Sequence, residues 1–444
     1  MPQKQQKKTN KLLGQLVAQG MQHHSAGRRD QAQACYEQVL AQAPKHPDAL
    51  HLTGLLAAQG GDFERAQTLI WQAITANPNE AMFHNNLGNV CVELHQMTAA
   101  EAMYARAIEL DPMRMDALSN LGALLSKSGR AEQAEPLLKR AVELAPNNSD
   151  WRQNLANHYM RQGRKADALT QCHEAMIFAP RNKALRSLLI MAYNESGHPE
   201  LAAKVLRAWI NEEPDNPIPR HQLAACTDDP VPARASDDYV ALLFDEFAQS
   251  FDAKLADLSY QAPALVAAEA TRRHSANKSL DVLDAGCGTG LCGPLLAPFA
   301  RALTGVDLSE GMLRQAAART VYDNIYQGEL VAFLAEQTLA YDLVVAADVL
   351  CYFGDLSAFC VNALAALRPG GSLIFTVESH GDEPKLPDFH LRGNGRYSQS
   401  RRYVDAALRD AGWHDVLIQP VVLRNEGGRP VDGWLVSAQR AGGG

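Results

Sequence analysis

The sequence predicts an α solenoid of helix pairs in its first half and an α/β domain with a mainly parallel sheet in its second half. Two observations carry this prediction. Small residues, turn glycines and prolines recur every 34 residues up to position 214. From position 280 onwards, short apolar runs end in acidic residues and alternate with helix-like patterns, and the first run leads into three alternating glycines.

The repeats come first along the chain. Prolines stand at positions 44, 78, 112, 146, 180 and 214, and alanines at 32, 66, 100, 134, 168 and 202. A third series (20, 54, 88, 122, 156 and 190) reads Gly, Gly, Gly, Gly, Ala, Ile, and a turn series reads Gly27, Gly61, His95, Gly129, Gly163, Gly197. Small residues let two helices approach closely, glycine ends a helix at positive φ, and proline cannot continue one. The period and pattern resemble the tetratricopeptide repeat, with six helix pairs.

The predicted domain organisation follows from these patterns. Residues 1–12, with four lysines and no acidic residue, are expected to form a disordered basic tail. The repeat array covers 13–216, and a linker rich in proline (Pro217, Pro219, Pro230, Pro232) covers 217–235. The second domain covers 236–440. The concave wall of such an array is expected to bind a protein or peptide, with a spacer or dimerisation role as the alternative.

Composition narrows the functional classes. The 444 residues are 46% hydrophobic and 21% charged, as in soluble globular proteins. A net charge of −8 argues against nucleic acid or an anionic membrane as the partner. Eight cysteines without a C-x-x-C pair favour reduced thiols in the cytoplasm over disulfides or zinc, and we expect no metal site. The oligomeric state stays open.

The second half is organised around the stretch L-D-V-L-D-A-G-C-G-T-G. Its apolar start predicts a buried strand that ends at Asp284, and Gly286, Gly288 and Gly290 allow a tight turn and close approach of a ligand. A second apolar run ends at Asp307, where α/β nucleotide folds bind ribose hydroxyls. We expect strands near 279–284, 302–307, 324–327, 341–347, 371–378, 414–423 and 431–439, the last two forming a hairpin.

Four motifs in order carry a resemblance: L-D-A-G-C-G-T-G, G-V-D-L-S-E-G-M-L, Y-D-L-V-V-A-A-D-V-L and L-R-P-G-G-S-L-I-F-T-V-E. They resemble class I S-adenosylmethionine-dependent methyltransferases, over about half of the chain. The resemblance implies a Rossmann-like seven-stranded methyltransferase domain with S-adenosyl-L-methionine as cofactor. It does not name the methyl acceptor, its reacting atom or a general base, so the catalytic residues stay unknown.

The resemblance also implies the cofactor contacts. Gly286, Gly288 and Gly290 would pass beneath the methionine part, with Asp284 holding the loop or reaching the amino group through water. Asp307 would bind the ribose, Leu308 and Met312 would flank the adenine, and Glu329 would accept from the adenine amino group. Asp348, Val349 and Leu350 would lie beside the sulfonium. The alternative for Asp307 is a helix N-cap.

Several residues near this predicted site allow two interpretations. Phe244, Phe247 and Phe251 lie on a helix that is either core or a lid over the cofactor. Tyr352 and His380 follow strands four and five, where a base would stand, but packing or surface positions are the alternative. Arg396, Arg401 and Arg402 would meet an acidic substrate group or begin a solvated helix.

Two other functions compete with an active methyltransferase that recruits a substrate or partner protein through its repeats. One is an interaction scaffold whose methyltransferase-like half has lost its chemistry, against which the intact glycine loop and Asp307 argue. The other is a nicotinamide-dependent oxidoreductase. A dinucleotide fingerprint would have its third glycine at position 291, which is leucine.

Overall fold

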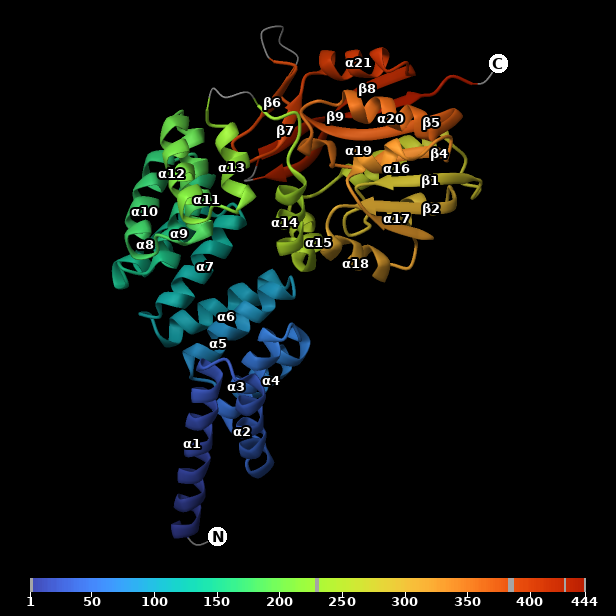
Figure 1. The fold of residues 1–444 in the computed structure, drawn as a ribbon. Helices are drawn as coiled ribbons and strands as arrows, with labels where there is room; N and C mark the ends of the chain where they lie inside the picture. The colour runs from blue at the N-terminus through green and yellow to red at the C-terminus, as the bar shows by residue number, and fades with distance from the viewer. Residues whose placement is uncertain (1–2, 228–230, 382–386, 427–428, 443–444) are drawn as a thin grey trace. The chain divides into compact units, whose positions relative to one another are not determined.

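The computed structural model describes residues 3–227, 231–381, 387–426 and 429–442, and it divides into two compact units, Met1–Leu189 and Ile190–Gly444 (Figure 1). Pro230 of the predicted linker, and Gly427 and Gly428 of the predicted hairpin turn, lie outside the described residues. No helix among the described residues is long and apolar enough to cross a membrane. All eight cysteines are buried as free thiols.

The first half of the chain consists of helix pairs, one for each predicted repeat. The pairs are α1 (Gln3–Ser25) with α2 (Arg29–Gln42), α3 (Pro47–Gln59) with α4 (Phe63–Ala76), α5 (Ala81–Glu93) with α6 (Met97–Leu110), α7 (Met115–Lys127) with α8 (Ala131–Leu144), and α9 (Ser149–Arg161) with α10 (Lys165–Phe178). The sixth pair, α11 (Lys183–Glu195) and α12 (Pro199–Glu212), crosses the boundary between the units. The six predicted helix pairs are therefore confirmed.

The repeated small residues are contact points between the two helices of a pair. A Cβ built on Gly88 would lie 2.5 Å from Tyr104 Cε1, and one on Gly122 would lie 2.7 Å from Leu138 Cγ. The six alanines of the 32–202 series are all 0% exposed. All six turn residues have positive φ, including His95 at 56°. The 34-residue period therefore marks two kinds of position: those where the partner helix approaches a small residue closely, and those where the first helix of each pair ends.

Two stretches differ from the predicted domain plan. Helix α1 extends back to Gln3, where a disordered tail was expected, because lysine and glutamine prolong an existing helix at little cost. A further helix, α13 (Pro217–Ala224), begins inside the predicted linker, with Asn216 as its N-cap. Trp209 of α12 is buried in a cluster with Ile190 and Cys226, against which Ile218 and Leu223 of α13 pack. Proline in its first turn lets α13 form where a linker was predicted.

The second unit contains a mixed sheet. Its strands in the described residues are β1 (Leu280–Ala285), β2 (Ala300–Asp307), β3 (Asn324–Gln327), β4 (Tyr341–Ala346), β5 (Leu367–Ser379), β6 (Phe389–Leu391), β7 (Tyr397–Gln399), β8 (His414–Glu426) and β9 (Arg429–Gln439). The first five lie in the order β3-β2-β1-β4-β5 and are parallel, while β9 pairs antiparallel with β5 and with β8. All seven predicted strands and the terminal hairpin are confirmed. The short pair β6–β7 was not predicted.

Helices cover both faces of this sheet and form its core. On one face α19 (Leu330–Ala335), α20 (Ser357–Ala366) and α21 (Arg401–Asp410) bury residues such as Phe359 and Leu408 against Phe375. On the other face lie α16 (Ala262–Arg273) and α17 (Gly293–Leu296). Their residues Val266 and Leu296 pack against the strand side chains that point to this second face. Helix α18 (Glu310–Ala318) follows β2. Parallel strands covered on both faces leave their carboxyl ends as the open edge.

We expect Gly88→Ala to lower stability by about 1–3 kcal/mol, because the added methyl group overlaps the Tyr104 ring. Gly14→Ala is the matched control: Gly14 lies in α1 with nothing within 4 Å of a built Cβ, so the same substitution should add roughly 0.5–1 kcal/mol. Chemical denaturation of the full chain, followed by circular dichroism, measures both. Equal effects at the two positions would contradict the close-contact role of Gly88.

Candidate functional site

A cavity of about 350 Å³ opens at the carboxyl ends of β1, β2 and β4. Its wall includes the loop after β1, the residues after β2 and β4, and two helices that precede the sheet, α14 (Asp237–Phe247) and α15 (Phe251–Asp257). Eight of the eleven predicted cofactor residues line it: Gly286, Gly288, Asp307, Leu308, Met312, Glu329, Asp348 and Val349. Asp284, Gly290 and Leu350 do not. The topology thus gathers most of the predicted set at one place.

The three glycines of the loop have left-handed backbones, with φ of 74°, 54° and 83° for Gly286, Gly288 and Gly290. A Cβ on Gly286 would lie 2.4 Å from Val349 Cγ2, and one on Gly290 would lie 2.9 Å from Tyr322 Cε2. At Gly288 nothing lies within 4 Å of a built Cβ. Two glycines are therefore required by packing within the protein, and the middle one leaves open space on the cavity side.

Asp307 fastens the glycine loop to the end of β2. Its Oδ2 accepts a hydrogen bond from the Gly288 amide and its Oδ1 accepts one from the Ser309 amide, both at 2.9 Å. Burial raises the pKa of this carboxyl, while the three backbone amides that it faces oppose the rise. Each carboxylate oxygen keeps a further lone pair, so Asp307 can accept hydrogen bonds from a ligand as well. The helix N-cap of α18 is Ser309.

Asp284 lies beneath the loop, 1% exposed, with its Oδ2 accepting a hydrogen bond from Tyr322 Oη at 2.6 Å. Burial raises its pKa to about 7; the Tyr322 hydrogen bond lowers it and the nearby Asp307 raises it. Two carboxyls therefore share one weakly solvated region under the glycine loop. Asp284 is absent from the described cavity wall, and both of its predicted roles stay predictions.

Two aspartates tie helices α14 and α15 to the start of α18 and to the glycine loop. Asp245 Oδ1 accepts from Ser309 Oγ at 2.5 Å and from the Gly311 amide at 3.0 Å, and Asp252 Oδ1 accepts from Thr289 Oγ1 at 2.5 Å. Phe244, Phe247 and Phe251, for which core and lid were both open, line the cavity. These contacts hold an aromatic wall over the loop and restrict the access of water.

A largely buried ionic cluster forms part of the polar wall of the cavity. Arg424 of β8 donates from Nη1 to both carboxylate oxygens of Asp348, at 2.9 and 2.7 Å, from Nη2 to Glu378, and from Nε to Glu426 Oε1 at 2.7 Å. Arg396 Nη2 donates to Glu426 at 2.8 and 2.6 Å, and its Nε lies 2.7 Å from Glu378 Oε1. We call these five residues the ionic cluster.

Asp348 is the member of this cluster nearest to β4, and its backbone has φ of 57°. Left-handed backbone in an aspartate costs free energy and persists where the surroundings impose it. Burial raises the pKa of its carboxyl to about 6, and the charge of Arg424 opposes this rise. Sequence reasoning missed Arg424, Glu378 and Glu426. Charged residues at the carboxyl ends of otherwise apolar strands were the available signal.

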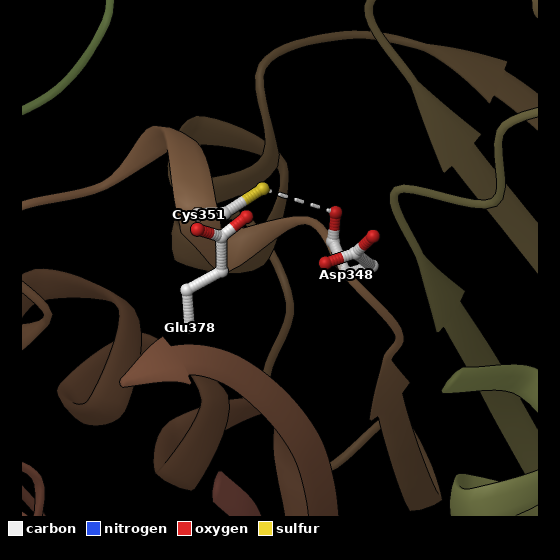
Figure 2. Close-up of side chains that lie close together, drawn as sticks. All are labelled: Asp348, Cys351 and Glu378. Atoms are coloured by element: carbon white, nitrogen blue, oxygen red, sulfur yellow. Dashed lines mark hydrogen bonds between the residues drawn. The ribbon is translucent and has the colours of Figure 1, made fainter. Parts of the chain in front are cut away.

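Asp348, Cys351 and Glu378 lie close enough to suggest a metal site (Figure 2). Their potential ligand atoms all lie within 4.8 Å of one another. However, the Arg424 guanidinium pairs with both carboxylates, in the place that a cation would take. Burial also raises the pKa of the Cys351 thiol, which donates to the Asp348 carbonyl at 3.3 Å. The group is therefore better explained as part of an arginine–carboxylate network than as a metal site.

The remaining residues with two interpretations differ in whether they line the cavity. Tyr352 lines the cavity, edge-on to Phe244 at 5.4 Å between ring centroids, and burial raises its pKa. His380 is hydrogen-bonded to Ser398 Oγ and to the Pro387 carbonyl, each at 3.0 Å, and is absent from the described cavity wall. Of the three arginines, Arg396 reaches the cavity. Arg401 begins α21, and Arg402 pairs with Asp388 at 3.0 Å.

The raised pKa of Asp284 makes a pH-dependent contribution to stability. Its folded pKa of about 7 exceeds its ordinary value of 3.8, so its contribution is full below pH 3.8 and is lost as pH rises through 7. We expect Asp284→Asn to remove this dependence and to gain stability over wild type at pH 8 relative to pH 5, by an amount on the order of 1 kcal/mol or more. Urea denaturation at the two pH values measures it. A constant difference between the two proteins would contradict the raised pKa.

A protein-family model matches each half of the chain. Residues 283–373 match a family model described as "Methyltransferase domain". Residues 4–222 match a tetratricopeptide-repeat model described as "Cilia and flagella-associated protein 70 C-terminal domain". Among solved structures, the chain is similar to a pilF protein of Pseudomonas aeruginosa, at 17% identity and a TM-score of 0.43, over 47% of this chain and 95% of that one. This score is too low to carry an argument about function.

Curated relatives are methyltransferases. An ubiquinone biosynthesis O-methyltransferase of Coxiella burnetii is 30% identical over 103 residues, which are 22% of this chain and 44% of that protein. A malonyl-[acyl-carrier protein] O-methyltransferase of Pseudescherichia vulneris is 29% identical over 187 residues, 41% of this chain and 72% of that protein. A probable S-adenosylmethionine-dependent methyltransferase of Mycolicibacterium smegmatis is 33% identical over 117 residues, 25% and 45% of the two chains. The chain thus spans less than half the length of the first of these relatives. The chain therefore combines an N-terminal array of tetratricopeptide-like helix pairs with a domain that is similar to methyltransferases.

Proposed function

We propose that the second unit is an S-adenosylmethionine-dependent methyltransferase and that the repeat array recruits its substrate or a partner protein. The methyltransferase assignment depends most on one observation, the hydrogen bond from the Gly288 amide to the Asp307 carboxylate. It holds the glycine loop and this carboxylate together on the wall of one cavity. The relative named as a probable S-adenosylmethionine-dependent methyltransferase supports the same cofactor.

The residues present fit this cofactor. Asp307 keeps carboxylate lone pairs for a pair of ribose hydroxyls, and Leu308 and Met312 offer apolar side chains for a flat base. The open space at Gly288 leaves room for an amino-acid part close to the backbone. Glu329 is the N-cap of α19, accepting from the Val331 and Ala332 amides at 3.0 and 2.7 Å, with lone pairs left for an amino group. We propose these roles in binding the ribose, the base, the amino-acid part and the adenine amino group, together with a place for Val349 beside the sulfonium.

When bound, the cofactor supplies a methyl group on a sulfonium, with a neutral sulfide as leaving group. The protein therefore needs to position an acceptor in line with the methyl group and needs no acid for the leaving side. Phe244, Phe251 and Tyr352 exclude water from the cavity, and Arg424 fixes Asp348 at its polar end. A proton on the acceptor would have to go to a base on this wall or to water.

The charges on the cavity wall favour an acceptor without net charge. Its cationic residues are Arg234, Lys254, Arg396 and Arg424, and its acidic residues are Asp307, Glu329, Asp348 and Glu426. The two arginines of the ionic cluster, Arg396 and Arg424, are both paired with carboxylates. A carboxylate substrate would have to displace one of these pairs, which costs free energy at a buried site.

The repeat array supports the second part of the proposal. Helices α3, α5, α7 and α9 are linked by polar side chains: Asn86 to His51 at 2.9 Å, Asn120 to Asn85 at 3.1 Å, and Asn154 to Ser119 at 2.9 Å. These hydrogen bonds fix the position of the first helix of each pair relative to the first helix of the next pair. The first helices together then form an extended surface with a constant distance between neighbours. A bound protein or peptide would be held at high effective concentration near the second unit.

We expect isothermal titration of the full chain to show binding of S-adenosylmethionine and of S-adenosylhomocysteine, and none of NAD. Asp307→Ala should weaken this binding by about 1–3 kcal/mol, the cost of losing hydrogen bonds to a charged group. Asp432→Ala, at an exposed position of the otherwise mostly buried strand β9, is the matched control. Unchanged affinity in the Asp307 variant would refute its assignment. Cofactor binding without methyl transfer to any acceptor would favour the scaffold alternative.

The role of the array is tested by removing residues 1–182 and incubating each protein with methyl-labelled cofactor in an extract of its source cells. We expect the fragment 183–444 to keep its cofactor affinity within about twofold and to label its acceptor about tenfold more slowly, because the acceptor is no longer concentrated near the site. Circular dichroism confirms folding. Equal labelling rates would show that the array serves another purpose.

A further inference from the structure

One loop brings a guanidinium from outside the methyltransferase motifs into the cavity. Residues 392–396 form a closed turn: the Gly395 amide donates to the Arg392 carbonyl at 2.8 Å, and the Arg392 amide donates to the Arg396 carbonyl at 2.9 Å. Arg396 leaves this turn and lines the cavity, where it joins the ionic cluster. The position of Arg396 therefore depends on what holds the turn.

The turn is held by helices that precede the sheet. His221 of α13, 7% exposed, donates from Nε2 to the Gly395 carbonyl at 2.9 Å. The imidazole lies against the Tyr239 ring of α14, with 4.1 Å between centroids. Gly395 has φ of 84°, and a Cβ on it would lie 2.3 Å from Tyr239 Oη. The segment is thus clamped between His221 and Tyr239 without space for another side chain.

A continuous chain of contacts leads from this clamp to the cavity. His221 holds Gly395; the next residue, Arg396, pairs with Glu378 and Glu426; and both carboxylates pair with Arg424, which holds Asp348. Glu378 is 0% exposed, so losing one of its cations leaves a buried charge with less compensation. Such a loss costs several kcal/mol unless the neighbours rearrange.

We propose that His221 is a positioning residue for the end of the cavity that the ionic cluster lines, where we place the methyl acceptor: through Gly395 it positions Arg396, and through the ionic cluster it positions Asp348. This inference rests on the proposed methyl transfer for its consequence. It makes α13, which follows directly after the last helix pair of the repeat array, a working part of the methyltransferase site. The cofactor contacts at Gly288 and Asp307 lie outside this chain of contacts, so they should not depend on it.

The test uses the full chain with His221→Ala, and with His221→Gln, whose amide nitrogen can again donate to the Gly395 carbonyl. We expect His221→Ala to raise amide hydrogen exchange in residues 392–397 by about tenfold, as expected for one lost buried hydrogen bond, while exchange in residues 286–290 is unchanged. The rate at which the protein labels its acceptor in the source-cell extract, with methyl-labelled S-adenosylmethionine, should fall by a similar factor. S-adenosylhomocysteine affinity should stay within about twofold, and His221→Gln should restore both exchange and labelling.

A second variant keeps the test decisive if His221→Ala does not fold. Gly395→Ala perturbs the clamp from the other side, and Gly412→Ala is its matched control, because Gly412 has φ of 92° but a built Cβ would lie 3.6 Å from its nearest atom. Slower labelling for Gly395→Ala and not for Gly412→Ala supports the proposal. Unchanged exchange and labelling in the folded His221 or Gly395 variants would overturn it. Failure of wild type to bind S-adenosylhomocysteine would instead refute the proposed function.

Discussion

The cavity depends on charge compensation around Arg424. This guanidinium is buried, with its side chain 3% exposed, and its bonds reach Asp348, Glu378 and Glu426 from three different strand ends. An unpaired charge in this position would be very costly, whereas a fully paired cluster is tolerated and fixes geometry. The arginine therefore ties the end of β4 to the ends of β5 and β8. Asp348, whose backbone is left-handed, is held at this point by both of its carboxylate oxygens.

A different constraint governs the repeat array. The first four helix pairs each have a point where a glycine backbone meets a side chain of the partner helix, as Gly88 meets Tyr104, and all six pairs have a turn with positive φ. Both constraints are local, so they appear in the sequence as residues that recur with the 34-residue period. Where the small residue is replaced by Ile190, the cluster around Trp209 and Cys226 belongs to the second unit. The degeneration of the last repeat thus coincides with a change in what it packs against.

This difference in range explains what the sequence could predict. The helix pairs, the seven main strands and the glycine loop followed from short patterns, because their causes lie within about 35 residues. The ionic cluster did not, because Asp348 and Arg424 are 76 residues apart and nothing near either one indicates the other. The strands β6 and β7 are three residues each, too short to give a periodic signal. The helix α13 was hidden by prolines, which mark linkers and also begin helices.

The contact between His221 and Gly395 spans 174 residues, a still larger separation in the sequence. It changes the meaning of the domain boundary. The predicted methyltransferase domain began at 236, after a linker, whereas the compact unit begins at Ile190 and includes α12 and α13. We propose that the functional boundary lies there as well. If His221 positions the loop of Arg396, a partner that distorts the last helices on binding would act on Arg396 through the contact between His221 and Gly395. Recruitment and positioning of the acceptor would then be two effects of one stretch of chain rather than separate tasks of two domains.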